Sequence, residues 1–97
     1  MVEIISDIFV SQWPLDHAVM THAIESGDAA SLRNTSHALK GSLGMFGAQP
    51  AVELAAELER LASSDQSALP VPFRAQASSL LSNLGVQVAA LLRVLQR

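Results

Sequence analysis

The stretch from residue 29 to residue 46, AASLRNTSHALKGSLGMF, decides how this chain folds. A helix advances about 100° per residue, so the large apolar side chains of this stretch fall on one narrow stripe. They are Leu32, Leu39, Leu43 and Phe46. His37 falls on the opposite side of the same helix. The pattern therefore predicts an amphipathic helix over 29–46 that buries its leucines and exposes an imidazole.

The helix face around His37 is made of small and basic residues. Its members are Ala30, Arg33, Lys40, Gly41, Gly44 and Ala48. A glycine in a helix interior costs about 1 kcal/mol relative to alanine, so two of them near a histidine need a reason. We interpret them as clearance that lets a partner protein reach the imidazole. Close packing of a second helix is the alternative, and the position of both glycines opposite the leucine stripe argues against it.

Turn residues mark where this helix and its successor begin and end. Gly27 is suited to stop the preceding helix, and Asp28 is a good N-cap for the helix over 29–46. Gly47 predicts the stop of that helix, and Pro50 predicts the start of the next one. Apolar residues then follow at i, i+3, i+4 and i+7 spacing, which predicts another amphipathic helix. They are Ala51, Leu54, Ala55, Leu58, Leu61 and Ala62.

The two ends of the chain are also predicted to be helical. Apolar spacing up to Phe9 indicates a short first helix, which we expect to break at Trp13-Pro14 because proline removes a backbone donor. A second helix then runs from Pro14 to Ile24, and its apolar face is Leu15, Val19 and Ala23, with Met20 as a further candidate. After a polar loop over 63–67, prolines at 70 and 72 mark the entry to a last helix towards Arg97. Its apolar seam is Phe73, Ala77, Leu80, Leu84, Val88, Leu91 and Leu95.

Length and composition agree with an all-α fold. The chain has 97 residues, which predicts one domain over residues 1–97, and it is rich in the helix formers alanine and leucine. Short connections favour antiparallel packing of successive helices. We therefore expect an up-down antiparallel four-helix bundle with a short additional N-terminal helix.

Several function classes are disfavoured by the same composition. The chain has no cysteine, so disulfides and thiolate metal sites are excluded, and His17 and His22 lack the i, i+4 spacing of two metal ligands. A net charge of −3 argues against nucleic acid and against anionic membranes. No basic leader segment precedes the first helix, and Arg93 interrupts the longest apolar run. We expect a cytoplasmic protein with no metal or cofactor of its own.

His37 and its neighbours form the constellation that can carry chemistry. A neutral imidazole, with a reference pKa of about 6.5, can accept a phosphoryl group. Lys40, one turn away, can place an ammonium beside the phosphoryl oxygens. Glu59 lies 22 positions downstream on the neighbouring antiparallel helix and could accept a hydrogen bond from one ring N–H, which would make the other nitrogen the nucleophile. Glu57 is the alternative partner, and a plain surface role for Glu59 stays open.

The segment from His37 to Ser42, followed by Gly47-Ala48 and Leu58-Glu59, resembles histidine-containing phosphotransfer (HPt) domains. The resemblance covers about residues 5 to 62. It implies a carrier in an Asp–His–Asp phosphorelay, in which His37 takes a phosphoryl group from one receiver domain and gives it to another. It also implies that Lys40 supports the phosphoryl group, that Gly41 permits close approach and that Glu59 is a polar partner of the histidine. The receiver would supply Mg²⁺, and no intrinsic kinase activity is expected.

Two other functions and one assembly question stay open. A receiver-binding module without phosphotransfer would have the same fold. A histidine-kinase dimerisation domain also carries a phosphorylated histidine, but that class has an acidic residue after the histidine and a proline soon after. Here Ala38 follows His37, no proline occurs before Pro50, and no P-loop is present. We expect a monomer, although Leu92 and Val94 lie off the main seam and leave a homodimer open.

Overall fold

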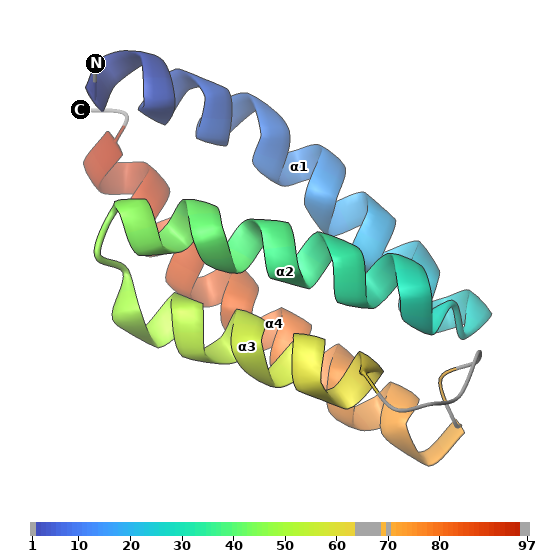
Figure 1. Ribbon diagram of the computed structural model, residues 1–97. Helices are drawn as coiled ribbons and strands as arrows, with labels where there is room; N and C mark the ends of the chain where they lie inside the picture. Colours follow the sequence, from blue (N-terminus) through green and yellow to red (C-terminus); the bar gives the residue numbers. More distant parts are fainter. Residues whose placement is uncertain (1, 64–68, 70, 96–97) are drawn as a thin grey trace.

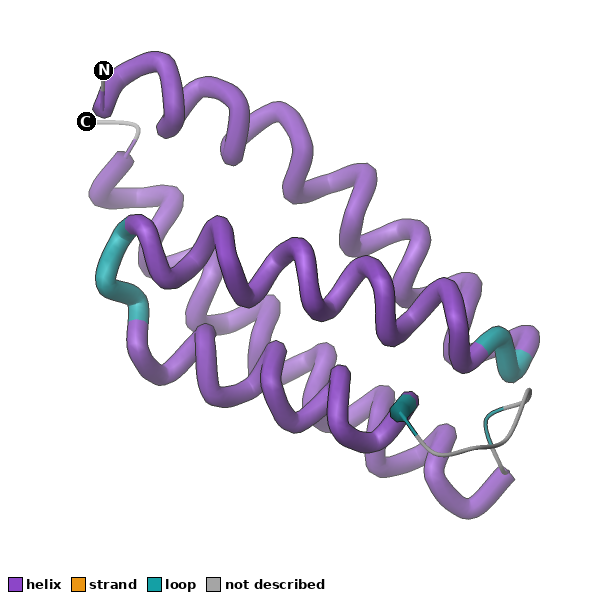
Figure 2. The backbone as a smooth tube through the Cα atoms, viewed as in Figure 1, coloured by secondary structure: helices purple, strands orange, loops and turns teal. Residues whose placement is uncertain are grey.

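Four helices follow one another along the described part of the chain: α1 (Val2–Ser26), α2 (Ala29–Met45), α3 (Gln49–Ala62) and α4 (Val71–Leu95). A computed structural model describes residues 2–63, 69 and 71–95, with side chains from residue 6 onward. Successive helices run in opposite directions, and α1 begins at the end of the bundle where α4 ends (Figure 1). Neighbours pack in the order α1–α2–α3–α4, and α4 closes the ring against α1. The predicted all-α bundle is confirmed, and no strand occurs in the residues described (Figure 2).

The predicted break at Pro14 is wrong. α1 is a single helix of 25 residues that passes through Pro14, so the described residues contain no additional N-terminal helix. A proline inside a helix costs about 3 kcal/mol, because one backbone hydrogen bond is lost and the ring crowds the preceding turn. Pro14 is exposed, while Phe9, Trp13 and Met20 are buried on the opposite side of α1. Burying each such large side chain contributes about 1.5–3 kcal/mol, which outweighs the cost of one proline.

Continuity through Pro14 also changes which face of α1 is buried. Leu15 and Val19, predicted to be apolar contacts, are exposed. Met20 and Ala23 of the predicted face are buried as expected, and the buried stripe keeps the phase set by Trp13 as far as Ile24. A helix that restarted at Pro14 could have chosen a new phase, whereas an unbroken helix cannot.

The expected caps define α2. Gly27 has φ +75° and Gly47 has φ +66°, the left-handed conformation that favours glycine after a helix. The side chain of Asp28 accepts a hydrogen bond from the backbone N–H of Ser31 at 3.1 Å, as an N-cap does. α2 therefore begins and ends within one residue of the predicted bounds.

The predicted apolar stripe of α2 lies in the core of the bundle. Leu32, Leu39 and Leu43 are buried, and Phe46 packs against the core from the end of the helix. The ring of Phe46 meets that of Phe9 edge to face, with centroids 5.4 Å apart. Of the stripe expected for α3, Ala51, Ala55, Leu58 and Ala62 are buried, and Leu54 and Leu61 are partly buried against the core. This packing determines which face of α2 points outward.

α4 follows the predicted helix but not its whole seam. Ala77, Leu84 and Val88 are buried as expected, whereas Phe73 is exposed and Leu81, outside the predicted seam, is buried. Contrary to expectation, α4 is long and apolar enough to cross a membrane by length and composition alone, with a mean hydropathy of 1.4 over its most apolar window. That is weak evidence for a span, because helices of water-soluble bundles pass the same test. Pro70 and most of the predicted polar loop lie outside the described residues.

Candidate functional site

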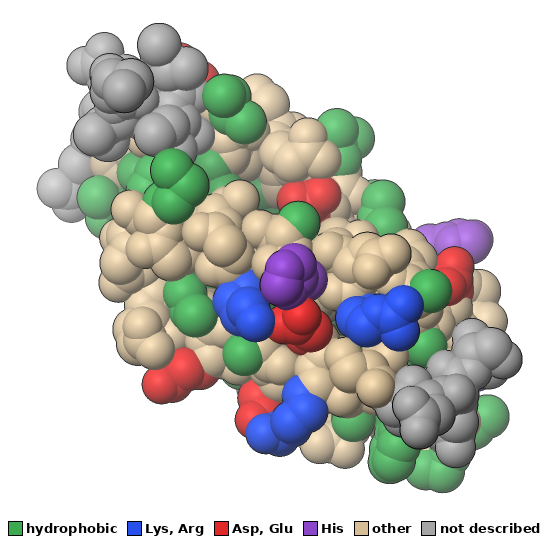
Figure 3. Space-filling model, in the orientation of Figure 1, with side chains coloured by type: hydrophobic (Ala, Val, Ile, Leu, Met, Phe, Trp, Pro, Cys, Tyr) green, Lys and Arg blue, Asp and Glu red, His purple; other side chains and the backbone are tan. Residues whose placement is uncertain are grey.

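His37 lies on the solvent face of α2, and 69% of its side chain is exposed. Its neighbours in sequence, Ser36 and Ala38, differ in burial: Ser36 is buried and Ala38 is exposed. Because Leu39 and Leu43 are buried in the core, the opposite face of α2 must turn outward. Basic and acidic side chains gather around a histidine on the face shown in Figure 3. The imidazole is therefore open to water and to a partner.

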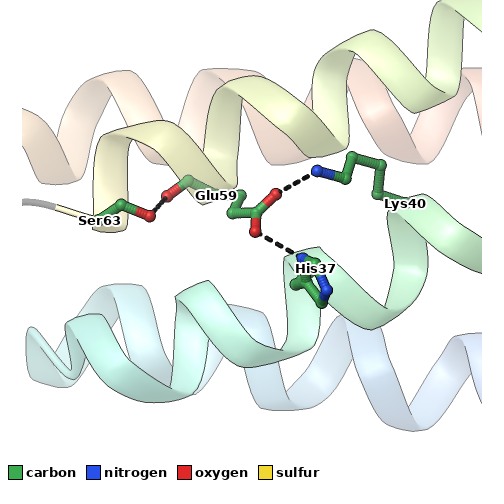
Figure 4. A network of polar contacts seen from close by, with 4 residues as sticks. All are labelled: His37, Lys40, Glu59 and Ser63. Carbon is green, nitrogen blue, oxygen red and sulfur yellow. Dashed lines mark hydrogen bonds and ion pairs between the residues drawn. The ribbon is translucent and has the colours of Figure 1, made fainter.

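The carboxylate of Glu59 reaches His37 from the neighbouring helix α3. Nδ1 of His37 and Oε2 of Glu59 lie 2.6 Å apart (Figure 4). An ionised carboxylate can only accept hydrogen bonds, so Nδ1 carries the proton and donates it. In the neutral ring, Nε2 then keeps its lone pair. The contact selects one ring nitrogen as the nucleophile and orients the ring.

Lys40 binds the other oxygen of the same carboxylate. Its Nζ lies 2.6 Å from Oε1 of Glu59, so Glu59 bridges a lysine and a histidine that are one helical turn apart on α2. The hydrogen bond from Lys40 is the largest cause that lowers the pKa of Glu59, and the hydrogen bond from His37 is the next. Partial desolvation acts in the opposite direction and is weaker. Glu59 is therefore ionised at neutral pH.

Two further contacts lie at the C-terminal end of α3, and the second occupies the side chain of Glu57, the alternative partner of the histidine. The hydroxyl of Ser63 donates a hydrogen bond to the backbone carbonyl of Glu59 at the end of α3 (Figure 4). Glu57 instead forms an ion pair with Arg60 on the exposed side of α3. The structure thus brings together His37, Lys40 and Glu59, and leaves the alternative residue Glu57 outside the group.

The glycines of the His37 face border open space. A Cβ atom built on Gly41 or on Gly44 would meet nothing within 4 Å among the described residues. The alternative interpretation, that these glycines permit close packing of another helix of the bundle, is therefore wrong. Ala30 is exposed and Arg33 is half-buried on the same helix. The prediction that Ala48 lies on the His37 face is wrong. α2 ends at Met45, so its helical phase does not extend to Ala48, which is the N-cap of α3 and packs against the core.

A family model for the Hpt domain matches residues 5–96. This chain belongs to the Hpt domain family. Histidine phosphotransfer in two-component signalling is the function of such domains, and receiver domains are their partners. The match extends through α4, beyond residues 5 to 62, which carry the sequence resemblance. No curated protein and no solved structure matches the chain significantly.

The described part of this Hpt domain contains no candidate metal-binding site. Among residues 2–63, 69 and 71–95, no group of three His, Cys, Asp or Glu side chains could hold a metal ion. His17 packs edge to face on Trp13, with centroids 5.5 Å apart, and is exposed.

One contact of the Hpt site is absent from the sequence-based predictions. The resemblance implies that Lys40 supports a phosphoryl group, whereas in the structure its ammonium is bound by Glu59. The spacing of the two residues is compatible with this contact, because Lys40 follows His37 by one helical turn on the same face. A carboxylate that reaches His37 from an antiparallel neighbour lies close to Lys40 as well.

Proposed function

We propose that this Hpt domain carries a phosphoryl group on Nε2 of His37 between the aspartates of two receiver domains. The observation that supports it best is the hydrogen bond from Nδ1 of His37 to Glu59. It leaves the exposed Nε2 as the nucleophile, on a face that Gly41 and Gly44 keep clear of side chains. A large donor protein can therefore approach the ring.

The proposed transfer exchanges one bond for another without any change in oxidation state. Nε2 attacks the phosphorus of an aspartyl phosphate, the N–P bond forms, and the P–O bond breaks to release the aspartate carboxylate. The proton on Nδ1 stays in place, so the phosphorylated ring is cationic. Glu59 stabilises that cation through the same hydrogen bond. In the second transfer, an aspartate oxygen attacks phosphorus and neutral His37 leaves.

The residues of this chain supply the acceptor and its orientation, and the receiver supplies the rest. We propose that the receiver contributes Mg²⁺ and the acidic pocket that binds it. The described residues of the Hpt domain offer the open imidazole, the carboxylate of Glu59 and the positive charges of Lys40 and Arg33. We propose no kinase activity for the chain alone.

A transfer assay against a panel of phosphorylated receivers tests this function. The wild-type chain should take up label that is acid-labile and base-stable, as phosphohistidine is, and the His37→Gln variant should take up none. Circular dichroism should show the same helix content for both chains, since the side chain of His37 is largely exposed. Uptake by the variant would refute the site.

The same assay separates the alternatives. Receiver binding by the wild-type chain without uptake of label would support a binding module that transfers nothing. Labelling of the chain by ATP alone would support a kinase-type domain instead. Uptake from a receiver, with none from ATP, supports the proposed carrier.

A further inference from the structure

The ammonium of Lys40 is already engaged in the resting site. Its Nζ lies 2.6 Å from Glu59, and only 35% of the Lys40 side chain is exposed. The low pKa of Glu59 keeps its carboxylate charged at neutral pH, so this ion pair persists there. An incoming phosphoryl group would have to compete with a carboxylate for Lys40. A second cation on the same face would meet no such competition.

Arg33 is that second cation. It precedes His37 by one helical turn on α2, and positions four apart in a helix hold their Cβ atoms about 5–6 Å from each other. Arg33 is half-buried, which restricts its side chain to the surface near its own turn. Within the part of the chain that the structure describes, the ion pairs are those of Glu59 and Glu57, and Arg33 takes part in none of them.

The positions of the two cations on α2 suggest different tasks. Lys40 follows His37 by three positions on the helix, and Arg33 precedes it by four, so the two cations lie on either side of the imidazole along α2. A guanidinium stays charged at any pH of interest and presents paired N–H donors that match phosphate oxygens. An ammonium bound to Glu59 instead neutralises a carboxylate and fixes its position.

We propose that Arg33 is the residue that binds the phosphoryl oxygens, and that Lys40 is a positioning residue that acts through Glu59. This inference rests on the proposed phosphotransfer at His37. The phosphoryl group on Nε2 extends outward from the α2 face, where the guanidinium of Arg33 can reach it across one turn. In this arrangement Glu59 keeps both of its contacts when His37 is phosphorylated.

Phosphoramidate tests the proposal without any receiver. The nitrogen of the phosphoramidate monoanion already carries three protons. Nε2 attacks phosphorus, the N–P bond to the imidazole forms, and the original P–N bond breaks to release neutral ammonia, while the proton on Nδ1 stays in place. The Arg33→Gln variant should react about tenfold more slowly, as expected for loss of one charge-assisted hydrogen bond. Arg33→Lys should recover part of the rate. Arg60→Gln, which removes an exposed arginine that pairs with Glu57, is the matched control and should react normally.

A second readout reports contact with the phosphoryl group directly. A bound cation favours the doubly charged phosphoryl group, so the ³¹P resonance of phosphohistidine should titrate at higher pH in Arg33→Gln than in the wild-type chain. Lys40→Gln should leave that midpoint unchanged. A wild-type rate and midpoint in Arg33→Gln, or a midpoint that moves with Lys40→Gln instead, would overturn the proposal.

The outcomes separate this inference from the proposed function. Labelling of the His37→Gln variant by phosphoramidate at the wild-type level would show that His37 is not the phosphoacceptor, which would refute the proposed function. Loss of labelling in His37→Gln, together with normal labelling of Arg33→Gln, would overturn only the role of Arg33. Circular dichroism of each variant verifies that the helical bundle is retained.

Discussion

Nδ1 of His37 lies 2.6 Å from Oε2 of Glu59, although 22 positions separate the two residues along the chain. The contact depends on the register of α2 against α3, which the buried Leu39 and Leu58 help to hold. The hydrogen bond therefore links the chemistry of the site to the packing of the core. Any change that shifts α3 along α2 should alter the orientation of the imidazole before it unfolds the bundle.

Replacing Glu59 by glutamine should change how stability depends on pH. The pKa of Glu59 is lowered from its ordinary value of 4.5 by Lys40 and then by His37. A carboxyl whose pKa falls on folding stabilises the fold above its unfolded-state pKa, and the contribution disappears as the pH drops through the lower folded-state value. The wild-type chain should therefore exceed Glu59→Gln in thermal midpoint at neutral pH, and the difference should shrink below about pH 4.5. A difference that grows on acidification would contradict this assignment.

Removing the Lys40 side chain should slow phosphotransfer several-fold while receiver affinity stays the same. Lys40 holds Glu59, and Glu59 holds the ring of His37, so its loss disorders the acceptor and leaves the docking face intact. Rapid-quench transfer rates and calorimetric Kd values for Lys40→Ala measure the two effects separately. In the Glu59→Gln background the same change should add little, because residues in one network are not additive. An equal loss of rate and affinity would indicate a docking role.

Local signals made α2 predictable from sequence. The N-cap at Asp28 and the left-handed glycines at 27 and 47 depend on a few neighbouring residues, and the structure has all three. The stripe of leucines also determined the exposure of His37, since burying one face of a helix exposes the other. The contact of Glu59 with His37 could be predicted because α3 runs antiparallel to α2 and the Gly47–Pro50 turn lies roughly midway between the two residues.

Tertiary packing decided the features that could not be predicted. A proline is a strong local signal for a helix break, but in α1 it is overridden by burial of Trp13 and Met20 on either side of Pro14. The burial of Leu81 in place of an expected seam residue depends on how α4 meets its two neighbours. The Lys40–Glu59 ion pair follows from the spacing of His37 and Lys40 only once Glu59 lies against His37, and that position depends on how α2 packs against α3.

The unbroken α1 leads to a prediction about Pro14. Pro14→Ala should raise the free energy of unfolding by about 1–3 kcal/mol, because it restores a backbone hydrogen bond and relieves crowding in the helix interior. Urea denaturation measures this change, and the dependence of the free energy of unfolding on urea concentration should be the same in both chains. Pro50→Ala is the matched control, since Pro50 stands in the first turn of α3, where the missing N–H costs nothing. An unchanged midpoint for Pro14→Ala would indicate that the helix breaks in solution.

The two left-handed glycines should respond differently to alanine. Each substitution places a side chain in a backbone conformation that costs about 1–2 kcal/mol. At Gly47 a Cβ would meet no atom of the described residues within 4 Å, whereas at Gly27 it would collide with the guanidinium of Arg74. That guanidinium donates hydrogen bonds to the backbone carbonyls of Leu69 and Glu25. Gly27→Ala should therefore cost about 1 kcal/mol more than Gly47→Ala in urea denaturation. Replacing Arg74 by alanine in the Gly27→Ala chain should cancel that excess. If the excess persists, its cause is strain in the backbone at residue 27 and not the collision with Arg74.

Gly41 offers a way to separate access to the imidazole from its reactivity. A Cβ at Gly41 meets nothing within 4 Å of the described residues, so Gly41→Leu should keep the fold and gain up to about 1 kcal/mol from better helix propensity. Its side chain would stand beside His37 where a receiver must approach, so transfer from a phosphorylated receiver should fall at least tenfold. Phosphoramidate, a small donor, should still label His37 at nearly the wild-type rate. Gly85→Ala on α4, also bordered by open space, is the control and should gain stability with no change in transfer. Normal receiver transfer by Gly41→Leu would show that clearance at this position is not needed.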